Sequence, residues 1–129
     1  MIPLCFRPTF VLQDEKLIKK RIGSSCGLIQ GKDGQEVVAI VGGSQKGMEI
    51  WNPIRKTVEL LWDEIPAEKD FGSGLFKSEL VPIEGEKEFI LYGGGEWISS
   101  STKDDIWKYV VADNTWTRYF FFVYLFQSI

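Results

Sequence analysis

The sequence predicts an all-β protein built from two antiparallel four-stranded sheets. Two apolar runs carry this prediction, Val37–Val41 and Phe89–Tyr92, and each stops at a glycine doublet. Neither run alternates with polar residues, which predicts strands that are buried on both faces. After each doublet comes an aromatic residue, and a second large residue follows it seven positions later. With 44% hydrophobic and 14% aromatic residues, the 129-residue chain is long and apolar enough to form a core.

The two units repeat with a period of 51 residues between their doublets, which is close to the roughly 50 residues of a kelch unit. Over about residues 21–118 the pattern resembles the kelch repeat family, in which each repeat is a four-stranded blade of a β-propeller. In that family the doublet ends the second strand, a Tyr lies on the third and a Trp on the fourth. Trp51 stands in place of the Tyr, and Val58 departs from the Trp. The motif positions are Gly42, Gly43, Trp51, Val58, Gly93, Gly94, Tyr109 and Trp116.

The glycines have a physical reason to end strands. Without a Cβ, glycine permits positive φ and close approach of another segment, and we expect a large ring to lie against the bare backbone. The alternative is that they are ordinary turn glycines of another antiparallel sheet. Two blades cannot close a ring, because propellers have about 4–8. The resemblance therefore implies an incomplete ring, either a fragment of a longer propeller or copies that associate.

The first repeat is expected over residues 21–66. Residues 1–20 match no repeat, and the stretch 11–20 is either a short helix or the last strand of a preceding blade. Val58, Leu60 and Trp62 alternate, so we expect them on one face of the fourth strand. The four expected strands lie within Arg21–Ile29, Glu36–Val41, Met48–Trp51 and Thr57–Trp62.

A connector over 67–77 separates the repeats, and the second repeat is expected over 78–119. The acidic stretch Asp63–Leu75 predicts an exposed linker, because its carboxylates have no EF-hand spacing for calcium. The tail 120–129 is apolar and atypical of a kelch blade; it is either a buried strand or a foreign end, and it is shorter than the about 20 residues of a membrane span. The expected strands are Ser78–Ile83, Glu88–Tyr92, Asp105–Val111 and Thr115–Tyr119.

Composition excludes several kinds of chemistry. The absence of histidine removes Ser/His/Asp and Cys/His triads and the commonest metal ligand. We therefore predict no catalytic residue, no metal and no cofactor, and no enzyme activity for these residues. A net charge of −3 argues against nucleic-acid or anionic-membrane partners. The only basic cluster, which runs from Lys16 to Arg21, is expected on a solvated face.

Recognition of a protein partner is the function that remains. The second doublet is followed by a long Ser-rich loop, and Trp97 within it is a candidate interface anchor; the alternative is that Trp97 folds back onto its own blade. The kelch resemblance implies an interaction module, such as an adaptor or a substrate receptor of a ubiquitin ligase. It also leaves open an actin-associated scaffold, or a sugar-acid isomerase or oxidase whose catalytic residues lie outside this chain. The candidate partner-binding residues are Glu96, Trp97, Ser99, Ser100 and Lys103.

The start of the chain and its cysteines predict a cytoplasmic protein. Residues 1–8 lack the basic start and apolar stretch of a secretory signal. Cys5 and Cys26 have no spacing that suggests a pair, so we expect free thiols.

Overall fold

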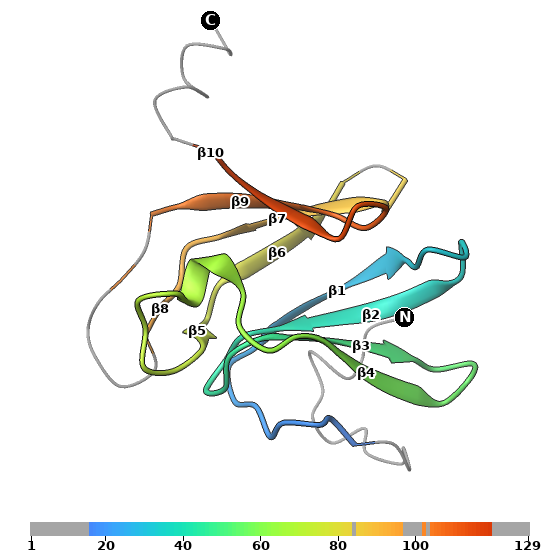
Figure 1. Ribbon diagram of the computed structural model, residues 1–129, viewed down its shortest axis with the longest axis horizontal. Helices are drawn as coiled ribbons and strands as arrows, with labels where there is room; N and C mark the ends of the chain where they lie inside the picture. The colour runs from blue at the N-terminus through green and yellow to red at the C-terminus, as the bar shows by residue number, and fades with distance from the viewer. Residues whose placement is uncertain (1–15, 84, 97–101, 103, 120–129) are drawn as a thin grey trace, which may run out of the picture.

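The computed structural model describes residues 16–83, 85–96, 102 and 104–119, and two antiparallel four-stranded sheets make up most of this part (Figure 1). The all-β prediction is confirmed, and the described residues contain no α-helix. The first sheet has the order β1 (Ser25–Gln30), β2 (Glu36–Val41), β3 (Met48–Asn52) and β4 (Thr57–Trp62). The second has the order β10 (Thr115–Tyr119), β9 (Ile106–Val110), β7 (Glu88–Tyr92) and β6 (Glu79–Pro82). A short pair joins β5 (Leu75–Phe76) to β8 (Gly95–Glu96).

The seven-residue spacing in the sequence is the register of a hairpin. Trp51 lies directly opposite Val58 in the β3–β4 pair, and Tyr109 lies directly opposite Trp116 in the β9–β10 pair. Each hairpin turn contains a residue with positive φ at the same place, Lys56 at 57° and Asn114 at 54°. Equal turns hold equal registers, so the two sheets are built on one plan.

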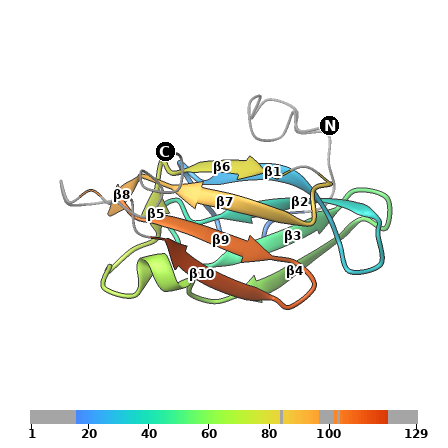
Figure 2. The same ribbon diagram turned by 90° about the horizontal axis from the view of Figure 1, so that it is seen from above.

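The two sheets stack face to face, with like strands over like strands. Figure 2 shows β6 over β1, β7 over β2, β9 over β3 and β10 over β4, and the two sheets do not close a ring. The main core lies between them, and burial of its apolar side chains stabilises the stack. Its fully buried members include Val41 and Met48 from the first sheet and Phe89, Leu91 and Tyr109 from the second.

The outer faces of the two sheets differ. On β2 both faces are buried, as predicted, because Val38 and Ile40 pack with Trp51 on the side away from the second sheet. On β7 the same prediction is wrong, because Tyr92 is 45% exposed. In the described part of the chain, no segment covers the outer face of the second sheet as the first sheet covers its inner face.

A β-bulge changes the end of β4. Leu60 lies opposite Glu49 and Trp62 opposite Met48, so Leu61 is an extra residue and the register shifts. Val58 therefore packs beside Trp51 on one face, whereas Trp62 packs against the core between the sheets. The prediction that Val58, Leu60 and Trp62 share a face is wrong for Trp62.

The stretch between the sheets is part of the core rather than an exposed linker. Its 3-10 helix η1 (Pro66–Glu68) and the segment after it insert side chains among those of the two sheets. The prediction of an exposed connector is therefore wrong, because apolar residues spaced along it reach the gap between the sheets. Its buried side chains are Ile65, Ala67, Glu68, Phe71 and Leu75.

The glycine doublets are approached by backbone, not by rings. A Cβ at Gly43 would lie 2.8 Å from the carbonyl oxygen of Ile22, and one at Gly94 would lie 2.8 Å from that of Phe76. Both glycines have positive φ, at 90° and 83°. The expectation of close approach is confirmed, but the expected partner was wrong.

Cys26 is disulfide-bonded, so the prediction of a free thiol is wrong at this position. Within the described residues, there is no helix with the length and apolar character needed to cross a membrane. The segment 1–15, most of the Ser-rich loop and the tail 120–129 lie outside the described residues.

Candidate functional site

The motif residues of the two repeats occupy structural positions. Trp51 and Tyr109 are 7% and 1% exposed, and both pack into apolar clusters. The doublets begin the loops that leave β2 and β7. The site therefore has to be sought in those loops, which the doublets place at one end of the sheets.

Of the predicted partner-binding residues, Glu96 is described, and Trp97, Ser99, Ser100 and Lys103 lie outside the described residues. The carboxylate of Glu96 accepts a hydrogen bond from the backbone N–H of Gly72 at 2.7 Å. This bond brings the start of the Ser-rich loop to the connector between the sheets. The β2–β3 loop of the first repeat, residues 42–47, also reaches this region. The N–H of Gly43 donates to the carbonyl of Leu75, next to the connector, at 2.7 Å.

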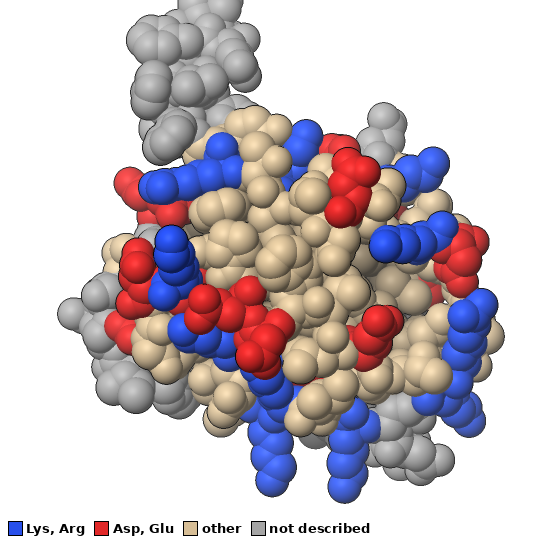
Figure 3. All heavy atoms as spheres, viewed as in Figure 1, with Lys and Arg blue, Asp and Glu red and all other residues tan. Residues whose placement is uncertain are grey.

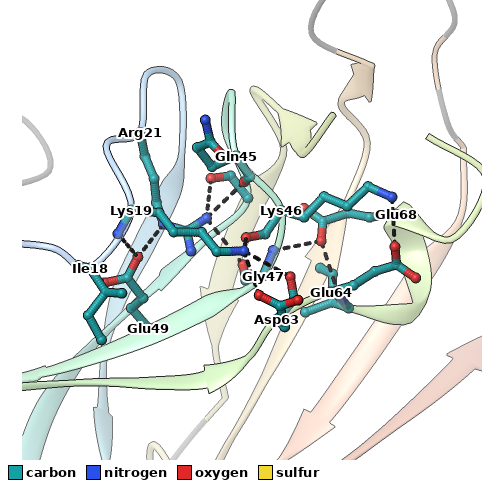
Figure 4. A network of polar contacts seen from close by, with 12 residues as sticks. Ile18, Lys19, Arg21, Gln45, Lys46, Gly47, Glu49, Asp63, Glu64 and Glu68 are labelled. Carbon is teal, nitrogen blue, oxygen red and sulfur yellow. Dashed lines mark hydrogen bonds and ion pairs between the residues drawn. The ribbon is translucent and has the colours of Figure 1, made fainter. Parts of the chain in front are cut away.

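These three segments form a surface that we call the loop rim: the β2–β3 loop 42–47, the connector 63–74 and Glu96. A hollow of about 510 Å³ lies on it. Lys46 and Glu64 pair across the hollow at 2.6 Å, and Lys19 pairs with Asp63 at 2.9 Å (Figure 4). The hollow is lined by Lys19, Ser44, Gln45, Lys46, Asp63, Glu64, Gly72 and Ser73.

A buried ion pair lies beneath the β2–β3 loop. Arg21 Nε donates to Glu49 Oε2 at 2.8 Å, and both side chains are completely buried. Arg21 also donates from Nη1 to the carbonyl oxygens of Gly42 at 2.9 Å and Gln45 at 2.8 Å (Figure 4). One guanidinium thus binds carbonyl groups at the start of the loop and within it, which holds the loop in one conformation. The prediction that this basic cluster lies on a solvated face is wrong for Arg21.

Glu49 completes this anchor by binding the segment before Arg21. Its carboxylate accepts hydrogen bonds from the backbone N–H groups of Ile18 at 2.6 Å and Lys19 at 3.1 Å. With the guanidinium, three donors satisfy a carboxylate that has no access to water. The loop, β3 and residues 18–21 are therefore held as one unit.

Glu68 binds the loop to the connector from the other side. Its carboxylate accepts from the N–H groups of Gly47 at 2.8 Å, Ile65 at 3.0 Å and Leu75 at 2.8 Å. Burial raises the pKa of Glu68 above its usual value, while these three hydrogen bonds and the charge of Arg21 act against that shift. Glu68 joins η1, β5 and the β2–β3 loop at a single side chain.

The described residues show no metal-binding cluster. They contain no group of three or more Cys, Asp or Glu side chains placed to hold a metal ion. The calcium alternative considered for the connector is not supported, since Glu68 is occupied by backbone donors and Asp63 pairs with a lysine. The rim is a surface of hydrogen-bonded loops and paired charges.

Neither a protein-family model nor a curated protein matches this chain.

The sequence reasoning missed the anchoring roles of Glu49 and Glu68. Glu49 did carry a signal, because it is a charged residue inside the otherwise apolar run Met48–Trp51. A carboxylate at such a position is buried only with a partner, and a nearby arginine is the natural one. Glu68 carried no comparable signal, since it lies in an acidic stretch beside Lys69 and Asp70 and its donors are backbone groups.

Proposed function

We propose that the chain is part of a kelch-type β-propeller and that it acts as a protein-interaction module through the loop rim. The kelch part of the proposal is supported by two like sheets, stacked strand over strand, each with a glycine doublet after its second strand. A propeller is built by stacking such sheets around an axis. The adaptor role within this proposal rests on the kelch resemblance alone.

The observation that carries the interaction role is the fixing of the rim. Arg21, Glu49 and Glu68 use buried polar contacts to hold the β2–β3 loop against β3 and the connector. Loops held in a single conformation lose little entropy when a partner binds, which favours affinity. On the rim, Lys46 and Glu64 place both signs of charge beside the hollow, which favours a partner with mixed charge.

Photo-crosslinking tests this proposal. The residue p-benzoylphenylalanine would replace Gln45, which is exposed on the rim, or Ile54, which is 76% exposed in the β3–β4 turn at the other end of the strands. In extracts of the source cells, we expect a distinct protein adduct from position 45 and not from position 54. Lys46→Glu should reduce its yield, and Lys46→Glu combined with Glu64→Lys should restore it. Equal adducts from both positions, or none from either, would contradict the proposal.

A further inference from the structure

β4 lies at the edge of the first sheet. β4 is the last strand of the first sheet, and no strand in the described ranges pairs with its outer side. The edge lies toward the viewer in Figure 1, beside that of β10. An edge strand presents a row of N–H and C=O groups that an extended peptide can bind as an added strand.

A cleft lies directly beside this edge. It measures about 350 Å³ and runs between β4 and the second sheet, where Tyr109 and Val111 form its far wall. Its floor is apolar and includes Ile29 and Val37, which belong to the core. Figure 3 shows uncharged atoms across the middle of this face and charged groups around it. Side chains of β4 that line the cleft are Thr57, Glu59 and Leu61.

Among the described residues, two charged side chains on the cleft, Lys32 in the β1–β2 turn and Glu59 on β4, make no ion pair. Arg55 and Asp33 pair with each other at 3.1 Å on its rim. Glu59 is exposed at the middle of β4 and makes no ion pair with the residues that the structure describes. An incoming segment with a cation opposite Glu59 would supply the missing partner.

We infer that β4 docks an extended peptide, which pairs antiparallel with it as a fifth strand of the first sheet. Side chains alternate between the faces of a strand, so every second residue of the peptide would enter the cleft. The residue opposite Leu61 would be apolar, and the residue opposite Glu59, two positions later, would be Lys or Arg. The recognised pattern is apolar–x–basic, on a surface separate from the loop rim.

Two labelled peptides test the pattern by fluorescence anisotropy. The probe is acetyl-Thr-Leu-Thr-Lys-Thr-Thr-amide, and its matched control has Glu in place of Lys. A favourable cross-strand charge pair is worth up to about 1 kcal/mol, so we expect the Lys peptide to bind up to about 5-fold more tightly. Glu59→Lys should reverse this preference, while Glu79→Lys, at an exposed position on β6 of the other sheet, should leave it unchanged.

Backbone methylation tests the mode of binding. In a strand, alternate N–H groups point toward the same neighbour, so N-methylation of one alternate set should abolish binding and methylation of the other set should not. Light scattering gives the state of the free chain. Failure of both peptides to bind the folded chain, equal effects of both methylation sets, or a dimer that the Lys peptide does not dissociate would each overturn the inference.

Discussion

The two sheets share one register but are held together by different chemistry. In the second sheet, the rings of Phe89, Tyr109 and Trp116 contact one another in tilted and edge-to-face arrangements, with centroids 5.0–5.6 Å apart. At the equivalent places the first sheet has Val38, Trp51 and Val58, with one ring instead of three. At its loop end the first sheet has a fully buried ion pair, and the described part of the second sheet contains none.

The comparison teaches that a repeat can conserve its hydrogen-bond register while its stabilising interactions move. The doublet and the hairpin turn set the register in both sheets. The side chains that pack around this shared backbone then differ: aromatic rings in the second sheet and a buried ion pair in the first. The loop rim at the first doublet is held by buried charged side chains. For this reason we favour it over the loop at the second doublet as a candidate binding surface.

Arg21→Met should have the largest effect. It leaves Glu49 as a buried charge without its cation, and loss of one partner of a buried pair typically costs about 3–5 kcal/mol. Urea denaturation followed by circular dichroism measures the change. The control is Arg55→Met, whose ion pair with Asp33 is exposed and should be worth about 0–1 kcal/mol. A similar loss of unfolding free energy in the two variants would show that the buried ion pair stabilises the fold no more than the exposed one.

Alanine at the two doublets sharpens the comparison. At Gly43 a Cβ would meet backbone of Ile22 and Ser24 at 2.8 and 2.9 Å, whereas at Gly93 no described atom lies within 4 Å. Both glycines have positive φ, which costs alanine about 1–2 kcal/mol. Gly43→Ala should cost about 1–3 kcal/mol more, because of the clash. Thermal denaturation measures the destabilisation of both variants. Equal destabilisation would show that the close backbone approach at Gly43 does not contribute to stability.

Tyr109→Phe should have the smallest effect at neutral pH. The phenol of Tyr109 donates to Asn114 Oδ1 at 2.6 Å, as does Trp62 Nε1 at 2.7 Å, so its loss should cost about 0.5–1.5 kcal/mol. Burial raises the pKa of Tyr109 to about 12 from an ordinary value of 10.0. Folding thus favours the neutral phenol, and the stability that it adds is complete below pH 10.0 and lost as the pH rises to about 12.

Tyrosinate absorbance during alkaline titration tests this value. One of the four tyrosines should ionise near pH 12 in the native chain, and this late step should be missing in Tyr109→Phe. A native chain in which no tyrosine ionises near pH 12 would contradict the burial of Tyr109.

Local patterns were enough to predict most strands. The bounds of Glu36–Val41, Thr57–Trp62, Glu88–Tyr92 and Thr115–Tyr119 agree with β2, β4, β7 and β10. Apolar runs that end at glycines or turn residues mark these strands in the sequence itself. The exposed face of β7 could not be predicted, because burial of a strand depends on what packs upon it.

Interactions distant in sequence set the limits of prediction at the site. Glu68 lies in an acidic stretch that indicates a solvated linker, yet it bonds to residues 21 positions before and 7 positions after it. Only the folded chain brings these donors together. The ionic anchor was not predicted, because Arg21 was expected on a solvated face and Glu49 was not recognised as its partner.

The central claim is that buried charges fix the loop rim, and amide hydrogen exchange of Gly47 and Leu75 tests it most directly. Both N–H groups donate to the buried carboxylate of Glu68. We predict that they are protected in the native chain, and that Glu68→Gln speeds their exchange about 10- to 100-fold, as expected for the loss of about 1.5–3 kcal/mol in charged hydrogen bonds, while the amide of Phe89 changes less. Rapid exchange of Gly47 and Leu75 in the native chain would contradict the claim.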